Sequence, residues 1–109
     1  MSSATAISIH PALDRLLRYL RGRPEIRSVI LFGSRARGDA DDRSDIDLAI
    51  EAPSLTRRQW LEIAEKVDEA ETLLSIDLIR LEEASDSFRK RIESEGIPLY
   101  ERLQSQTEP

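Results

Sequence analysis

Two aspartates near the middle of the chain are spaced so that they could act together. Asp45 and Asp47 lie at the head of an apolar run, Ile46–Ile50, that is typical of a short buried strand. Side chains alternate along a strand, so both carboxylates should project from the same face. Two ionised carboxylates side by side repel each other unless a cation neutralises them. Because oxygen ligands without histidine or cysteine favour magnesium or manganese over zinc, the pair predicts a site for a divalent cation.

A third aspartate interrupts a later apolar strand. Asp77 lies within the alternating run Ser75–Leu81. Burying a lone carboxylate costs free energy, so Asp77 should face a cation or a solvent-filled cleft. If the two strands are neighbours, Asp45, Asp47 and Asp77 could hold two magnesium ions, the arrangement used for in-line phosphoryl or nucleotidyl transfer.

The residues that follow an earlier strand are suited to binding phosphate. Gly33 comes directly after the apolar run Ser28–Phe32 and would permit a close approach of the backbone. Ser34 offers a hydroxyl and free amides to phosphate oxygens. Arginines nearby add positive charge, although ion pairs with neighbouring surface acids explain them equally well. This choice stays open for Arg35, Arg37 and Arg43.

Two common motifs do not fit this loop. Gly33 and Gly38 have the spacing of a P-loop, but the next two residues, aspartate and alanine, replace its lysine and its serine or threonine. An EF-hand loop that began with that aspartate would need glycine and glutamate where the chain has Ser44 and Ile50.

The composition restricts the kinds of site and the compartment. The 109 residues contain no cysteine and one histidine, which excludes disulfides, cysteine nucleophiles, thiolate zinc sites and multi-histidine metal sites. No apolar run approaches the ~20 residues of a membrane span and no signal segment opens the chain, so we expect a cytoplasmic protein without membrane contact. The formal net charge of −5 argues against direct nucleic-acid binding.

The charge is divided unevenly along the chain. Residues 1–43 hold eight arginines and five acids, a net charge of +3, whereas residues 44–109 hold eight basic and sixteen acidic residues, a net charge of −8. A basic half could meet phosphates, and an acidic half could hold metals or face a basic partner. By charge count alone, an uneven but solvated surface is the simpler interpretation.

Helical periodicity marks the segments that must position these residues. Apolar residues at helical spacing predict a helix that follows Ser8 and ends before Gly22. A capping-box pattern at Thr56 opens a second helix, whose apolar stripe includes Trp60 as a core residue or, alternatively, a partner contact.

A third, weaker helix is expected over Glu82–Glu95, with Phe88 and Ile92 as its apolar anchors, and Ile97–Tyr100 could add an edge strand. Helices that alternate with short strands in one small chain predict an α+β fold with a small mixed sheet of three or four strands and helices packed on one face.

The length allows one compact domain, since domains commonly have ~100–150 residues. We expect this domain over residues 8–103, with flexible termini at residues 1–7 and 104–109.

The spacing of the candidate residues resembles a known signature, which runs Gly33-Ser34, ten residues, Asp45, one residue, Asp47, with Asp77 as a later third acid. This pattern is similar to the glycine-serine and paired-aspartate signature of the DNA polymerase beta nucleotidyltransferase superfamily. In a chain of this length it most resembles the minimal nucleotidyltransferase (MNT) antitoxins, which are encoded beside HEPN-domain ribonuclease toxins. The resemblance covers roughly residues 12–103 and implies the polymerase beta-like palm fold.

The resemblance implies a role for each matching residue. Gly33 and Ser34 would hold the β- and γ-phosphates of a nucleoside triphosphate. Asp45 and Asp47 would ligate both magnesium ions, and Asp77 would ligate the ion that activates the attacking hydroxyl.

The activity implied by the resemblance is magnesium-dependent transfer of AMP from ATP to a hydroxyl, in this family a tyrosine, of a cognate HEPN toxin, which neutralises the toxin. The nucleotide-binding set would then include Arg35 and Arg37. Two alternatives remain open: an antitoxin that masks the toxin by contact alone, and a nucleotidyltransferase that acts on a small molecule.

Overall fold

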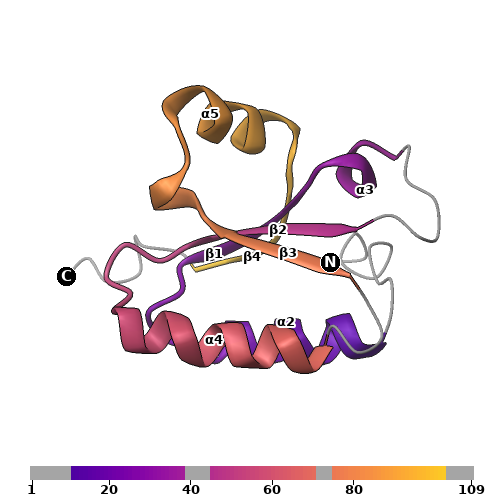
Figure 1. Cartoon of the computed structure of the whole chain (residues 1–109). Coiled ribbons are helices and arrows are strands. Elements are labelled where there is room, and N and C mark those ends of the chain that lie inside the picture. Colours follow the sequence, from indigo (N-terminus) through magenta and orange to yellow (C-terminus); the bar gives the residue numbers. More distant parts are fainter. Residues whose placement is uncertain (1–10, 39–44, 71–74, 103–109) are drawn as a thin grey trace.

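A four-stranded mixed sheet forms the centre of the protein. The computed structural model describes residues 11–38, 45–70 and 75–102. The strands β1 (Ser28–Phe32), β2 (Ile46–Glu51), β3 (Ile76–Arg80) and β4 (Ile97–Glu101) lie in the order β3-β2-β1-β4. Strand β1 pairs antiparallel with β2 and β4, whereas β2 and β3 are parallel (Figure 1). The expected α+β class and small mixed sheet are confirmed.

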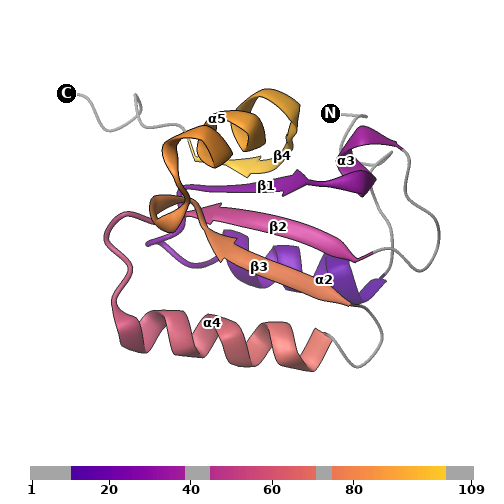
Figure 2. The ribbon, with the colours of Figure 1, turned by 45° about the horizontal axis from the view of Figure 1, so that its top comes forward.

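Helices cover both faces of this sheet. The long helices α2 (Pro11–Arg21) and α4 (Arg57–Ala70) lie side by side below it, and α5 (Asp86–Glu95) lies above it (Figures 1 and 2). The expectation that the helices share one face is therefore correct for α2 and α4 and wrong for α5. The reason is a second apolar cluster on the upper face, made of Ala49, Leu81 and Ile92, against which a helix can bury its own apolar residue.

The main core lies between the sheet and the two long helices. Alternate strand residues such as Leu31 and Leu48 point into it and are buried, as period-two alternation requires. From the helices it receives Leu13, Leu16, Leu20, Ile63 and Val67. The capping box predicted at the start of α4 is present. Gln59 N–H donates to Thr56 Oγ1 at 3.1 Å, and Thr56 N–H donates to Gln59 Oε1 at 2.8 Å.

The third helix begins later than its sequence suggests. Residues Leu81–Glu83 form a short 3-10 turn, η1, and α5 starts at Asp86 after Ser85, whose Oγ accepts from Phe88 N–H at 3.2 Å. Of the two expected anchors, Ile92 is buried, but Phe88 is 37% exposed. Phe88 is therefore a surface aromatic and not a core residue.

A short helix, α3 (Ser34–Arg37), follows Gly33 directly. The proposed termini at residues 1–7 and 104–109, and Ser8, lie outside the described residues. In the ranges described, no helix has the length and apolar run needed to cross a membrane.

Candidate active site

The pairing of β2 with β3 brings the candidate aspartates together. Asp47 and Asp77 are register partners across this parallel pair, and Asp45 directly precedes β2. On the other side of β2, Asp47 is the register partner of Phe32, the last residue of β1. The carboxylates therefore lie where β1 ends and where β2 and β3 begin.

The carboxylates of Asp47 and Asp77 share the face of the sheet that α5 partly covers (Figure 1). Within β2, Ile46 and Leu48 point into the main core, so Asp47 between them points to the opposite face. Asp77 alternates in the same way with Leu78, which packs against the main core. Asp45 and Asp77 are exposed and Asp47 is half-buried, so the group is open to solvent and ligands.

The electrostatics of Asp47 reflect this grouping. Burial raises the pKa of Asp47 above its ordinary value, and the charges of Asp77 and Asp45 raise it further. The positive charge of Arg37 acts in the opposite direction. Asp47 is thus a carboxylate whose charge is disfavoured by its surroundings and would be favoured by an added cation.

Gly33 lies against Asp47 and makes the turn from β1 into α3. Its φ of +76° is one that side-chain-bearing residues rarely adopt. A Cβ at this position would collide with Asp47 Oδ2 and lie 3.1 Å from Asp47 Cγ. The Gly33 carbonyl accepts from Ala36 N–H and Arg37 N–H, each at 3.1 Å. Glycine is therefore required both by the backbone turn and by the neighbouring carboxylate.

The remaining candidates fall on α3 or outside the described residues. Ser34 and Arg35 open α3 directly after Gly33, but their side chains lie outside what the structure describes. Arg37, at the end of α3, is exposed and acts on Asp47. Arg43 and the surface acids expected to pair with these arginines fall in the undescribed segment 39–44.

Whether Asp45, Asp47 and Asp77 suit magnesium can be judged from the chemistry of their ligand atoms. Among the described residues, no three histidine, cysteine, aspartate or glutamate side chains converge closely enough to hold a metal ion. Mutual repulsion of three carboxylates is consistent with their spread. Carboxylate oxygens nevertheless are the ligands that magnesium prefers, and a cation would stabilise the charge of Asp47, whose pKa is raised first by burial and then by Asp77 and Asp45. The residue types therefore fit magnesium.

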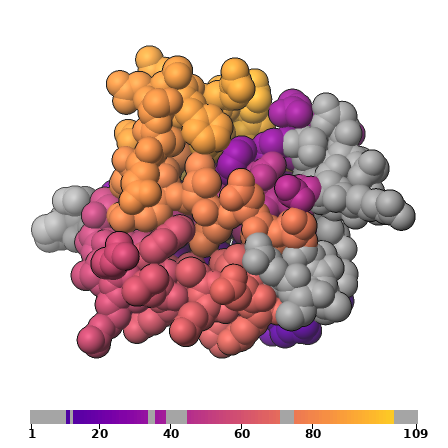
Figure 3. Space-filling model, in the orientation of Figure 1, coloured from indigo at the N-terminus to yellow at the C-terminus, as the bar shows by residue number. Residues whose placement is uncertain are grey.

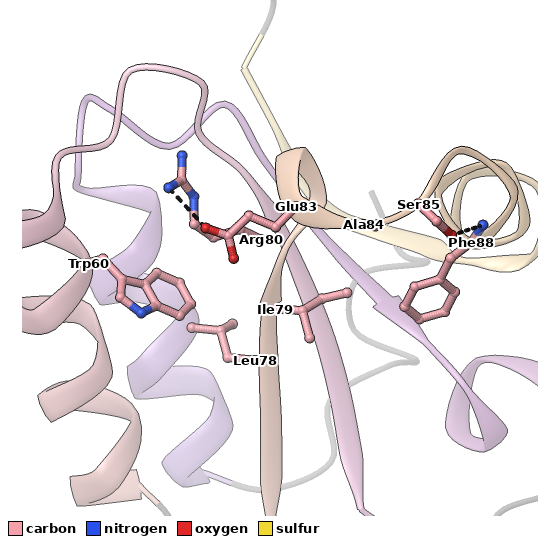
Figure 4. Close-up of a pocket in the computed structure, with 8 residues that line it drawn as sticks. All are labelled: Trp60, Leu78, Ile79, Arg80, Glu83, Ala84, Ser85 and Phe88. Carbon is pink, nitrogen blue, oxygen red and sulfur yellow. Dashed lines mark hydrogen bonds and ion pairs between the residues drawn. The ribbon is translucent and has the colours of Figure 1, made fainter.

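A groove beside β3 was not anticipated from the sequence. It has a volume of about 350 Å³ and is lined by Trp60, Leu78, Ile79, Arg80, Glu83, Ala84, Ser85 and Phe88 (Figure 4). We call it the β3-edge groove. Sequence periodicity assigned Trp60 first to the core and Phe88 to an apolar helix face. One feature of the sequence could have indicated that Phe88 is exposed: few apolar residues accompany it in its helix.

A mixed sheet with a glycine turn and paired aspartates at one end is the architecture of a nucleotidyltransferase of the polymerase beta type. The family model "Polymerase beta, Nucleotidyltransferase" matches residues 14–105. The chain belongs to this family and is a nucleotidyltransferase, which confirms the superfamily indicated by the sequence pattern.

Curated relatives point the same way. The "Putative protein adenylyltransferase MJ0141" of Methanocaldococcus jannaschii is 34% identical over 79 residues, which are 69% of this chain and 80% of that protein. A second protein of the same name and organism, MJ1379, is 29% identical over 95 residues, covering 85% of this chain and 95% of that protein.

Solved structures share the fold. A chain of a crystal structure described as a toxin-antitoxin with AMP-PNP superposes with a TM-score of 0.64 at 29% identity, covering 87% of this chain and 74% of that chain. A second structure is described as the tri-AMPylated Shewanella oneidensis HEPN toxin in complex with MNT antitoxin. One of its chains superposes with a TM-score of 0.57 at 28% identity, covering 88% of this chain and 71% of that chain.

Proposed function

We propose that this protein is an antitoxin that transfers AMP from ATP, with magnesium, to a tyrosine hydroxyl of a partner toxin of the HEPN class, and so neutralises it. The observation that carries the proposal is the register pairing of Asp47 with Asp77 beside the Gly33 turn. It places two carboxylates on adjacent strands, next to a turn that lacks a side chain, where metal-assisted transfer needs both acidic ligands and room for phosphate. A cytoplasmic location is part of this proposal.

Each residue has a defined part in this reaction. Gly33 and the amides that open α3 receive the β- and γ-phosphates, with Ser34 adding a hydroxyl. Arg35 and Arg37 supply positive charge on the same helix. Magnesium would be held by Asp45, Asp47 and Asp77, and when bound it supplies charge neutralisation at the phosphates and acidifies the attacking hydroxyl.

The chemical step is a substitution at the α-phosphorus of ATP. The hydroxyl oxygen of the acceptor forms a new bond to this phosphorus, while the bond to the bridging oxygen of the β-phosphate breaks. Pyrophosphate leaves, and the proton of the acceptor hydroxyl passes to a nearby carboxylate or to water. The protein contributes by holding the triphosphate and the acceptor in line, since positioning provides much of the rate gain in such reactions.

The relatives support the choice of donor and acceptor. Two are named as protein adenylyltransferases, one fold neighbour was solved with AMP-PNP, and another contains a toxin carrying AMP groups.

The competing proposal is an antitoxin that only masks its partner. It is disfavoured because pure binding gives no reason to cluster Asp45, Asp47 and Asp77, whose repulsion costs stability. A small-molecule acceptor is a further alternative, which a transfer assay with the partner protein separates.

The test uses ATP labelled at either its α- or its γ-phosphate, with magnesium and the proposed HEPN-class partner protein. Nucleotidyl transfer places the α-label on the partner and leaves the γ-label in pyrophosphate. Label from the γ-position on the partner would show phosphoryl transfer instead. Neutralisation of the partner without ATP and without label would establish masking.

A further inference from the structure

The β3-edge groove lies at the free side of the sheet. Strand β3 is the last strand in the order β3-β2-β1-β4, so within the described residues no strand pairs with its outer edge. Trp60 of α4 stands on one side of the groove and Phe88 of α5 on the other, with Leu78 and Ile79 of β3 between them (Figure 4). Figure 3 shows α4 and, above it, the segment from β3 to α5 on one face of the molecule.

The groove is suited to an apolar or aromatic side chain. Two aromatic rings and two aliphatic side chains line it. Arg80 is the one cationic group among the described residues that line it, and it is held within the chain. Its Nη2 donates to the Ala52 carbonyl at 3.0 Å, and it forms ion pairs with Glu82 at 3.8 Å and Glu83 at 3.6 Å. Because these charges are already paired, an ionic ligand would gain little there.

The groove and the carboxylate site share strand β3, with Asp77 near the start of the strand and the groove beside its later residues. Asp77 directly precedes Leu78 on the same strand, and Ile79 lies on the same face of the sheet as Asp77. Phe88 contacts Phe32, the register partner of Asp47, in an edge-to-face pair with ring centroids 5.8 Å apart. An occupant of the groove would therefore reach Asp77 with only a short length of chain.

The sheet order separates the two substrates. Strand β2, which carries Asp47, has β1 and the Gly33 turn on one side and β3 with the groove on the other. In-line substitution requires the nucleophile and the leaving group on opposite sides of the phosphorus. A triphosphate held at the Gly33 side thus leaves the β3 side for the nucleophile.

From this geometry we propose that the β3-edge groove binds the acceptor protein, taking an apolar or aromatic side chain from the segment that carries the accepting hydroxyl. This inference rests on the proposed function and adds where the acceptor docks. The groove acts as an anchor that places the hydroxyl beside Asp77. Apolar anchors seated in such recesses commonly dominate the affinity of an interface.

The test fills the groove without altering the carboxylates. Ala84→Trp places an indole in the groove, and Ser94→Trp adds the same side chain at an exposed position of α5 that does not line it. AMP transfer to the proposed HEPN-class partner is followed as a function of the partner's concentration, and ATP binding with magnesium is measured by calorimetry. Phe88→Ala, which removes a groove wall, is the second variant.

We expect Ala84→Trp and Phe88→Ala to raise the KM for the acceptor at least about tenfold, with ATP affinity unchanged and Ser94→Trp like the wild type. An unchanged KM in either folded groove variant would overturn the groove assignment and leave the proposed function standing. Absence of transfer by the wild-type chain would instead overturn the proposed function, and the groove assignment with it.

Discussion

Asp47 and Asp77 stand opposite each other on adjacent parallel strands, thirty positions apart in the sequence. Each points to the face of the sheet away from the main core, and the charge of Asp77 disfavours the charge of Asp47. The backbone pairing of β2 with β3 therefore imposes an electrostatic cost on the folded chain. We interpret this arrangement as a site for cations, because a bound cation would offset the electrostatic cost.

Asp47→Asn should stabilise the metal-free protein. The folded-state pKa of Asp47 lies above its unfolded value, so the folded chain binds more protons than the unfolded chain between these two values. Stability contributed by this group is present at low pH and is lost as the pH rises through the folded-state pKa. We expect the variant to melt at a higher temperature than the wild type in chelator at about pH 7, with the gain vanishing below the ordinary aspartate pKa of about 4.

The control for this experiment is Asp68→Asn, which removes an exposed carboxylate on α4 away from the site. It should change the melting temperature little at either pH. A melting temperature for Asp47→Asn that is equal to or below that of the wild type at neutral pH would show that the three carboxylates do not repel one another in the folded chain. The same variant should lose transfer by orders of magnitude, since it removes a proposed metal ligand.

Gly33→Ala should damage both folding and catalysis. A methyl group there meets the carboxylate of Asp47, and the φ of +76° adds backbone strain. Gly38→Ala is the matched control, because Gly38 has a similar φ of +86° but a Cβ there would meet no atom of the described residues within 4 Å. We expect Gly38→Ala to lower the free energy of unfolding by about 1 kcal/mol, the cost of left-handed backbone alone, and Gly33→Ala by clearly more.

Urea unfolding of both variants measures this difference, and ATP binding is measured on the same samples. Gly33→Ala should weaken ATP binding, whereas Gly38→Ala should retain it. Equal losses of stability in the two variants would mean that the close approach of Gly33 to Asp47 has no energetic consequence.

Ser34→Ala should impair the use of ATP and leave the fold intact. Its proposed role is a hydrogen bond from the hydroxyl to a phosphate oxygen, at the first residue of α3. We expect a stability change of less than about 1 kcal/mol together with weaker ATP binding. The affinity for ATP is measured by calorimetric titration of each protein with ATP in the presence of magnesium. Identical affinities for the variant and the wild type would show that Ser34 is not part of the phosphate site.

Thr56→Ala should destabilise the protein without affecting its chemistry. The Thr56 hydroxyl accepts from Gln59 N–H at the start of α4, which follows the end of β2, whereas Asp45 and Asp47 lie at the beginning of that strand. Loss of such a cap costs about 1 kcal/mol. Ser54→Ala, at an exposed residue of the preceding turn, should be neutral. Transfer rates like that of the wild type in both variants are expected below their melting temperatures, and a selective loss of transfer in Thr56→Ala would contradict a purely structural role.

Local patterns in the sequence were sufficient for several elements. Strand β1 has the predicted bounds, Ser28–Phe32, because an apolar run closed by a glycine is a local signal. The same-face placement of Asp45 and Asp47 follows from the two-residue period of a strand. The capping box at Thr56 also depends only on residues three apart.

Features that depend on long-range pairing were not accessible in the same way. The register of Asp47 with Asp77 and the contact of Gly33 with Asp47 depend on the order of strands, which no local pattern specifies. The position of α5 on the second face follows from a small cluster around Ala49, a residue too small to mark a helix-binding surface in the sequence. For the same reason the exposure of Phe88, and the groove that it lines, became apparent only in the fold.

The central claim is tested most directly by the intact mass of the partner protein after incubation with this chain, ATP and magnesium. The proposed reaction predicts a gain of about 329 Da, the mass of one adenylyl unit, or a multiple of it. The gain should be absent with Asp45→Asn, with Asp77→Asn, or when magnesium is chelated. An unchanged mass for a partner that is nevertheless inhibited would contradict the account, as would full transfer by the Asp45→Asn variant.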